Sequence, residues 1–231
     1  LSYTNLAEEH LNPRNNVGIQ DLSTMGEVDI KGPGAERLIN RLLVNDVRDM
    51  LPGQVRYSTM VNPEGGIVDD VTAYKFNDEH WMIVTSSAPR KKSFRWINEH
   101  AVGMSAYCTD LTGAIALITV QGPRSRDLLS ALSDQQDKLG KLKFFNFMAA
   151  RVNEVELLIS RSGYTGELGY ELYVPAEQAM DVWEHLLNKG RDFGVRPYGT
   201  GAMQSLRIEK ALPLAGPDVP DDESRTPFNL G

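Results

Sequence analysis

The sequence is poor in the groups that build disulfide frameworks and metal centres. Its 231 residues include one cysteine, Cys108, so no disulfide can form within the chain and no thiolate cluster can be built. Such sparing use of cysteine fits a reducing compartment, and we expect a cytoplasmic protein, or one of the mitochondrial matrix if the source is eukaryotic. The four histidines lack the spacing of metal ligands, so we expect no metal site: His10, His80, His100 and His185.

The sequence also lacks a long apolar run and a basic run. Hydrophobic residues make up 41% of the chain and charged residues 24%, which is ordinary for a globular protein. No stretch approaches the roughly 20 apolar residues of a membrane span. The net charge of −7 makes nucleic acid and anionic membranes poor candidates as partners.

The short motifs of several enzyme classes are absent. The chain contains no HExxH, no GxSxG and no GxxxxGK[ST]. Glycines 163, 166 and 169 are spaced by three, which does not match a dinucleotide-binding fingerprint. The candidate functional groups are therefore carboxylates, tyrosines and backbone.

Alternating strand and helix patterns fill residues 27–110. Leu38, Ile39 and Leu42 fall on one face of a predicted helix, and β-branched runs predict strands around it. The order is β-α-β-β-β-α-β, close to a split β-α-β layout. The predicted strands are residues 27–30, 55–61, 67–76, 81–86 and 105–110, and the predicted helices are residues 34–44 and 91–101.

The second half shows signs of the same plan. Gly32-Pro33 and Gly122-Pro123 each follow a predicted strand and precede a helix, and they lie 90 residues apart (122 − 32). The predictions are strands at residues 118–121, 154–161 and 170–174, a helix at 124–132, and an amphipathic helix from Ala179 that ends at Gly190. Two related α+β units fit this pattern, and so does an ordinary strand-to-helix junction used twice.

Two adjacent acids, Asp69 and Asp70, follow a strong turn signal at residues 62–66. Neighbours on a strand point to opposite faces, so at most one of the two can face a given pocket. A carboxylate against apolar walls could serve as an acid or a base. The alternative is a solvated hairpin edge with two exposed aspartates, and this stretch alone favours that alternative.

Residues 161–171 interleave two tyrosines and two glutamates with three glycines. Glycines let a backbone approach a ligand closely, and tyrosine offers a flat apolar face with a polar tip. An ionised carboxylate accepts two parallel hydrogen bonds, which suits the edge of a heterocycle such as a pterin. A plain turn between two strands is the alternative. A third segment, residues 199–210, predicts a solvated helix with a few core contacts.

Taken in order, these segments resemble the aminomethyltransferase (glycine cleavage T-protein) family. Residues 163–171 carry its G-Y-T-G-E-x-G-Y-E signature unbroken, and residues 60–70 resemble its M-x-N-x-x-G-G-x-x-D-D hairpin. Residues 15–25 are similar to its N-terminal segment, residues 121–123 to its Q-G-P turn, and residues 226–231 to its T-P-x-E-x-G-L stretch cut short. The resemblance covers nearly the whole chain but about two thirds of a family member.

The resemblance implies an α+β, T-protein-like folate-binding fold, with ferredoxin-like β-α-β units around a central pocket. It places a ferredoxin-like domain at residues 27–112, inserted in a folate-binding domain made of residues 1–26 and 113–231. A C-terminal barrel-like domain would follow Gly231, and some residues would precede Leu1.

The resemblance also implies the chemistry, a one-carbon transfer to tetrahydrofolate in glycine catabolism and one-carbon metabolism. Asp69 would be the catalytic carboxylate beside N10 of tetrahydrofolate, and Glu171 would hold the pterin edge. Tyr164 would pack near the folate, with further contacts from Tyr57, Val61 and Thr85.

The one-carbon donor is left open by the sequence. Thr85 and Met203 depart from the T-protein pattern, and residues 202–210 look more like the folate domains of sarcosine and dimethylglycine dehydrogenases. The donor could be a small molecule or carrier-bound, so the expected partner is a lipoyl carrier protein or an attached flavin domain. A non-catalytic folate-binding module is the other alternative, but its relatives carry a cysteine in the loop matching residues 163–166, and this chain has none there.

Overall fold

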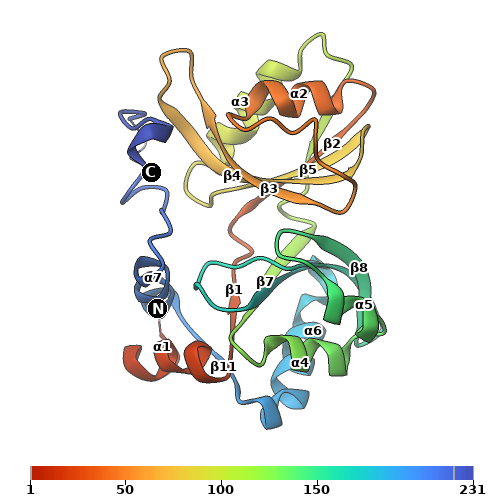
Figure 1. Cartoon of the computed structure of the whole chain (residues 1–231), viewed down its shortest axis with the longest axis vertical. Helices are drawn as coiled ribbons and strands as arrows, with labels where there is room; N and C mark the ends of the chain where they lie inside the picture. The colour runs from red at the N-terminus through yellow and green to blue at the C-terminus, as the bar shows by residue number, and fades with distance from the viewer. Residues whose placement is uncertain (1, 221, 231) are drawn as a thin grey trace. The chain divides into compact units, whose positions relative to one another are not determined.

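A computed structural model describes residues 2–220 and 222–230. The chain divides into two compact units, one of Leu1–Ser23 and Ala114–Leu212, the other of Thr24–Gly113 and Pro213–Gly231 (Figure 1). The expected inserted domain, residues 27–112, has its ends within a few residues of this division, whereas residues 213–231 group with residues 24–113. The assignment of functions to these domains stays a prediction. Gly231, the last residue of the T-P-x-E-x-G-L-like stretch, lies outside the described residues.

The unit of residues 24–113 is built on a five-stranded antiparallel sheet in the order β3-β4-β5-β2-β6. Helices α2 and α3 lie together over one face of it, as Figure 1 shows. The elements are β2 (Gly26–Lys31), α2 (Ala35–Leu42), β3 (Val55–Val61), β4 (Ile67–Asn77), β5 (His80–Thr85), α3 (Arg90–Ala101) and β6 (Tyr107–Asp110).

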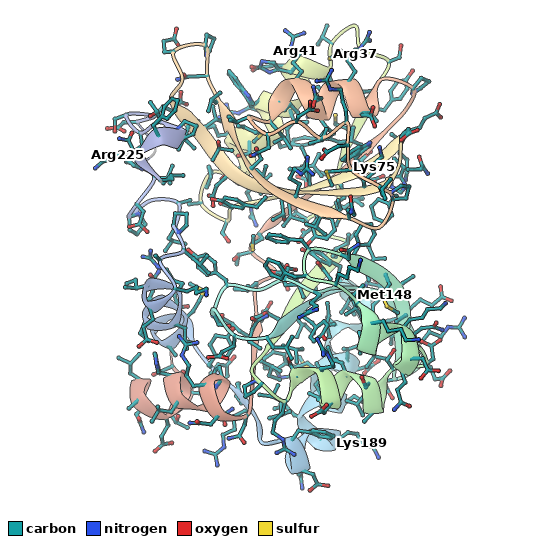
Figure 2. All side chains as sticks on the ribbon, in the orientation of Figure 1. Arg37, Arg41, Lys75, Met148, Lys189 and Arg225 are labelled. Atoms are coloured by element: carbon teal, nitrogen blue, oxygen red, sulfur yellow. The ribbon has the colours of Figure 1, made fainter. Side chains whose placement is uncertain are left out.

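The apolar face of α2 explains this packing. Leu38, Ile39 and Leu42 are at most 3% exposed and lie against sheet residues such as Ile30 and Ile83. Burying side chains of this size stabilises the fold by roughly 1.5–3 kcal/mol each. The opposite side of α2 carries Arg37 and Arg41, which point away from the sheet in Figure 2.

One cation is buried within this unit. Lys75 of β4 is buried, and its Nζ lies 2.7 Å from Glu36 Oε2 and 2.8 Å from Asp78 Oδ1. The ammonium also lies 5.1 Å from the centre of the Trp81 ring. A buried charge needs such partners, so these contacts explain how a lysine is accommodated in a central strand.

The other unit has a six-stranded sheet in the order β11-β1-β7-β10-β9-β8, in which only the β1–β11 pair of the described strands is parallel. Helices α4, α5 and α6 bury leucine and valine side chains against it. The elements are α1 (Leu6–Asn15), β1 (Val17–Asp21), β7 (Ile115–Gln121), α4 (Ser125–Leu132), α5 (Gln136–Lys141), β8 (Phe147–Val152), β9 (Val155–Ser160), β10 (Gly169–Pro175), α6 (Ala179–Lys189), β11 (Val195–Pro197) and α7 (Thr200–Glu209).

The two units share one plan. The strand order β3-β4-β5-β2 in one matches β8-β9-β10-β7 in the other, and a helix follows the equivalent strand in each, α2 after β2 and α4 after β7. Gly32 and Gly122 have φ of 127° and 133°, a region that favours glycine. Each of their carbonyls accepts a bond from the N–H three residues on, at 2.9 Å and 3.0 Å. The repeat suggested by the 90-residue offset is therefore present in the fold.

The expected α+β class is confirmed, and each strand and helix predicted from the sequence is present with ends shifted by a few residues. Among the described residues, five α-helices and strands were not predicted, namely α1, β1, α5, β8 and β11, and neither were the short 3-10 helices at Ala176–Gln178, Arg191–Phe193 and Pro227–Asn229. Helix α1 has no apolar stripe and contains Pro13, and β11 has three residues, so their sequence signals are weak. Among the described residues, no helix has the length and apolar character to cross a membrane.

Candidate functional site

The β3–β4 hairpin is shaped by its turn. The Asn62 side chain accepts hydrogen bonds from the N–H groups of Gly66 at 2.7 Å and Glu64 at 3.1 Å, and Gly65 has a φ of 87°. Asparagine and glycine are the residues that such a turn requires. Asp69 and Asp70 follow this turn and lie near the start of β4, where Asp69 is paired with Met60 of β3.

Asp69 is 1% exposed, so the alternative of two solvated aspartates is wrong for this residue. Its Oδ2 accepts a hydrogen bond from Ser93 Oγ at 2.6 Å and one from the N–H of Ser86 at 3.2 Å. Its Oδ1 is buried and has no hydrogen-bond partner among the described residues. Burial, reinforced by the charge of Asp70, raises the pKa of Asp69 to about 7, although the two serine donors oppose the shift. Such a carboxyl can hold or release a proton near neutral pH.

Asp70 points to the other face of the strand, as the alternation of side chains predicts. Its Oδ2 accepts a hydrogen bond from the Tyr57 hydroxyl at 3.1 Å, and its Oδ1 accepts one from Ser86 Oγ at 3.0 Å. Burial raises its pKa from the ordinary value, and these two donors oppose that effect. Ser86 therefore contacts both aspartates, Asp69 through its backbone and Asp70 through its hydroxyl.

The other predicted contacts of this unit lie on the same sheet. Tyr57 is 38% exposed and shares a face with Asp70. Val61 is half-buried at the end of β3, where the pairing with β4 shifts register. Thr85 ends β5, is fully buried, and donates from its hydroxyl to the carbonyl of Gly26 at 3.3 Å.

The signature of residues 163–171 forms a loop that leads into β10, in the other unit. The side chain of Gln121, fully buried at the end of β7, lies inside this loop. Its Nε2 donates to the carbonyls of Ser162 and Tyr170, both at 3.2 Å, and its Oε1 accepts from Thr165 Oγ1 at 2.9 Å. One buried amide therefore holds both ends and the middle of the loop.

Gln121 also explains two of the three signature glycines. A Cβ atom on Gly163 or Gly169 would lie 2.0 Å or 2.1 Å from Gln121 Oε1, closer than atoms can approach. The backbone explains the glycine at position 166, because Gly166 has a φ of 80°, a region that favours glycine. The spacing of three reflects packing of Gly163 and Gly169 on one side chain and a left-handed turn at Gly166.

We expect Gly169→Ala to lower the free energy of unfolding by about 2 kcal/mol, because the new methyl group overlaps Gln121. Gln121→Ala should cost a similar amount through unpaired buried partners. The double variant should lose clearly less than the sum, since removal of Gln121 frees the space. Urea unfolding of the four proteins measures this, with Gly140→Ala as the control because nothing lies within 4 Å of a Cβ there. Strictly additive losses would contradict the explanation.

Glu171 and Tyr164, the predicted pterin contacts, belong to this unit and are half-buried. Glu171 Oε2 accepts a hydrogen bond from Ser162 Oγ at 2.5 Å and a longer one from the Tyr173 hydroxyl at 3.5 Å. Ser162 Oγ also lies 2.8 Å from Ser160 Oγ. The Ser162 and Tyr173 hydroxyls both donate to the same carboxylate oxygen, Oε2.

The third segment, α7, has a structural role. Arg207 is 6% exposed, and its guanidinium donates to Gln204 Oε1 at 3.0 Å and to the carbonyl of Leu212 at 3.1 Å. Arg14 of α1 donates to Glu209 of α7 at 2.7 Å and to Glu167 of the signature loop at 3.0 Å. The helix therefore supports the loop and contributes more buried contacts than the sequence suggests.

The structure places Asp69, Thr85, Tyr57 and Val61 on one sheet, but Tyr57 lies on the face of Asp70, whereas Asp69 lies on the opposite face against Ser93 of α3. Tyr164 and Glu171 lie on the loop and strand of the other unit. Four residues that hydrogen-bond to these groups or to their loop were not predicted from the sequence: Ser86, Ser93, Gln121 and Ser162. Gln121 and Ser162 lie in segments already noted, but Ser93 carries no local signal. No group of three or more metal-ligating side chains occurs among the residues that the structure covers.

Comparison with known proteins finds relatives that agree with one another in name. A family model described as the GCVT N-terminal domain matches residues 2–231. The aminomethyltransferase of Halothermothrix orenii is 37% identical over 231 residues, which is 100% of this chain and 63% of that protein. The aminomethyltransferase of Moorella thermoacetica is 39% identical over 224 residues, 97% of this chain and 61% of that protein. The chain thus spans about three fifths of the length of these relatives.

Solved structures agree at the level of the fold. The crystal structure of glycine cleavage system aminomethyltransferase T from Bartonella henselae matches with a TM-score of 0.85 at 28% identity, over 98% of this chain and 61% of that chain. A chain of the heterotetrameric sarcosine oxidase from Corynebacterium sp. U-96 matches with a TM-score of 0.59 at 10% identity, over 84% of this chain and 95% of that chain. The second likeness shows a shared fold alone.

Proposed function

Because the chain belongs to the aminomethyltransferase family, by its match to the GCVT N-terminal domain, we propose that it supplies the tetrahydrofolate-handling part of a one-carbon transferase. The reaction would move a one-carbon unit from an amine donor to tetrahydrofolate. The observation that carries the proposal is Asp69, a buried carboxyl with one oxygen held by two donors and the other without a partner among the described residues. Relatives named aminomethyltransferase over the whole chain support the same reaction class.

Asp69 would act on the nitrogen that receives the carbon. Its Oδ1, which has no hydrogen-bond partner among the described residues, would accept the N–H of that nitrogen and take its proton as the new nitrogen–carbon bond forms. The bond between the carbon and its donor would break, with its electron pair leaving on the donor. A pKa of about 7 suits this exchange, because the carboxyl can be ionised before the step and protonated after it.

Glu171 would bind the pterin edge. Ser162 and Tyr173 orient this carboxylate, and an ionised carboxylate accepts the parallel hydrogen bonds that a ring N–H and an exocyclic amino group donate. Tyr164, Tyr57, Val61 and Thr85 would add contacts to the folate, as expected from the sequence. The rate advantage would come largely from placing the nitrogen against the bound carbon donor.

We propose the one-carbon donor only by its chemical class. The names of the relatives favour an aminomethyl group as the transferred unit, and the partner that we propose to deliver it is a lipoyl carrier protein. Donation from an oxidised methylamine made by a flavin domain is the alternative raised by residues 202–210. The sarcosine oxidase likeness, at 10% identity, does not favour it.

Calorimetric titration with tetrahydrofolate tests the folate assignment. We expect the wild-type protein to bind, and Glu171→Ala to weaken binding by about 30-fold, because the ligand loses hydrogen bonds to a charged group. Glu177→Ala, at an exposed position of the same unit, is the matched control and should bind as the wild type does. If neither this chain nor the full-length gene product binds tetrahydrofolate, the folate assignment is wrong. If Glu171→Ala binds tetrahydrofolate as tightly as the wild type, the pterin does not contact Glu171.

A further inference from the structure

The centre of the signature loop is held by a single arginine from a distant part of the chain. Arg14 lies in the last turn of α1, and 21% of its side chain is exposed. Its Nη1 donates to the carbonyl of Thr165 at 2.7 Å and to Glu167 Oε1 at 3.0 Å. A guanidinium presents its N–H donors in one rigid plane, so it can hold a carbonyl and a carboxylate together. The first glutamate of the signature therefore has a partner within the protein.

The same guanidinium also binds α7. Arg14 Nη2 donates to Glu209 Oε2 at 2.7 Å and to the carbonyl of Leu206 at 3.3 Å. The contacts of Nη1 and Nη2 together connect α1, α7 and the signature loop, three segments that are far apart in the sequence. Arg14 is therefore a junction within this unit, and its loss would release all three segments at one point.

Helices α1 and α7 form a fixed base for this arginine. They lie side by side (Figure 1). Glu9 of α1 is 3% exposed, and its Oε2 accepts the N–H of Gly199, the residue before α7, at 2.7 Å. His10 Nδ1 lies 2.7 Å from Ser205 Oγ of α7. Arg14 is thus presented to the loop by a helix that is itself held in place, which favours a precise contact.

We propose that Arg14 is a positioning residue, which keeps the signature loop in the conformation that presents Tyr164 and leads into Glu171. A glycine-rich loop has many accessible conformations, so it is ordered only where contacts offset the entropy of ordering. Thr165 is fully buried and is held twice, by Gln121 through its hydroxyl and by Arg14 through its carbonyl. The expected effect on tetrahydrofolate rests on the proposed function, in which Tyr164 and Glu171 contact the folate.

Loss of Arg14 should act on binding through the population of the ordered loop. A ligand that binds only the ordered loop has an affinity proportional to the ordered fraction. If the loop is ordered in about a tenth of the molecules without Arg14, the affinity falls about tenfold. Lysine would keep the charge but not the planar fork, so Arg14→Lys should restore the ordered loop only in part.

Hydrogen exchange of the full-length gene product without ligand tests the loop itself. We expect the amides of residues 163–168 to exchange about tenfold faster in Arg14→Met than in the wild type, with Arg14→Lys between the two. Glu167→Gln leaves the α7 contacts of Arg14 in place and should give a smaller increase. Arg151→Met is the matched control, because Arg151 makes an ion pair of 2.6 Å with Glu156 on the β8–β9 hairpin of the same unit. Unchanged exchange of the loop in both Arg14→Met and Glu167→Gln would overturn the proposal.

Titration and transfer kinetics with tetrahydrofolate give the second readout, which a general loss of stability would not produce. In Arg14→Met, the Kd and the KM for tetrahydrofolate should rise about tenfold, whereas kcat should stay within about twofold of the wild type. An unchanged Kd in Arg14→Met, in a protein where Glu171→Ala loses affinity, would overturn the role of Arg14 alone. Binding of tetrahydrofolate that does not depend on Glu171 would instead overturn the proposed pterin contact on which this effect depends.

Discussion

Asp69→Asn is expected to lower the rate of one-carbon transfer to tetrahydrofolate by about a thousandfold. Removing a group that takes a proton in the transition state typically costs 10²- to 10⁴-fold. Asparagine keeps the size of the side chain and can still receive the Ser93 and Ser86 donors through its oxygen, but it cannot accept a proton. The affinity for tetrahydrofolate should change much less than the turnover number, because binding involves many other contacts.

Stability separates this effect from misfolding. The folded-state pKa of Asp69, about 7, lies above its ordinary value of 3.8. Stability conferred by the protonated carboxyl is therefore complete below about pH 4 and is lost as the pH rises through 7. The asparagine in Asp69→Asn does not ionise, so the variant does not lose this stability as the pH rises. It should be at least as stable as the wild type at pH 8.

The measurement is single-turnover transfer in the full-length gene product, with an aminomethyl-lipoyl carrier or formaldehyde as donor. Asp70→Asn is the matched control, because Asp70 is the adjacent residue and its carboxylate is occupied by Tyr57 and Ser86. We expect that control to cost no more than about tenfold. A comparable loss in both variants would show that the two aspartates act as one unit, and an active Asp69→Asn enzyme would refute the role of Asp69.

Glu27→Gln is expected to stabilise the protein at alkaline pH by on the order of 3 kcal/mol relative to its effect at pH 4. Glu27, on β2, is fully buried, and neither of its carboxylate oxygens has a hydrogen-bond partner among the described residues. Burial, together with the charge of Asp110, raises its pKa to about 8, and Arg90 opposes the shift only in part. In the folded wild type Glu27 therefore stays uncharged, and ionisation of its carboxyl lowers the stability of the fold.

The sign follows from the two pKa values. Below about pH 4 the carboxyl is protonated in both the folded and the unfolded chain, so the glutamine variant has no advantage. Between the ordinary value of 4.5 and the folded value of about 8, the unfolded chain ionises while the folded chain resists. The advantage of glutamine should grow through this window and level off above about pH 9.

Urea unfolding of wild type and Glu27→Gln at pH 4, 6, 8 and 9.5 measures the difference. Glu64→Gln, in the exposed turn of the β3–β4 hairpin, is the control and should change stability by less than about 0.5 kcal/mol at each pH. A constant difference between wild type and Glu27→Gln across the range would mean that Glu27 is not buried as an uncharged group.

Much of the local structure followed from the sequence, because its signals are local. The turn at residues 62–66, the apolar stripe of α6 and the glycine–proline junctions at 32–33 and 122–123 each act within a few residues. The signature at residues 163–171, taken in order with the other segments, indicated the family, and strand alternation predicted that Asp69 and Asp70 would point to opposite faces.

The tertiary structure decided which of these groups have unusual chemistry. A sequence does not state that Asp69 and Glu27 lose contact with water, since burial depends on what packs over a strand. It does not bring Ser93 to Asp69, or Gln121 into the loop of residues 163–171, because these contacts join segments 24 and 42–48 residues apart (93 − 69, 163 − 121 and 169 − 121). Local sequence motifs thus identify the candidate reacting groups. Their pKa values and orientations depend on long-range packing, which changes solvation and supplies hydrogen-bond donors.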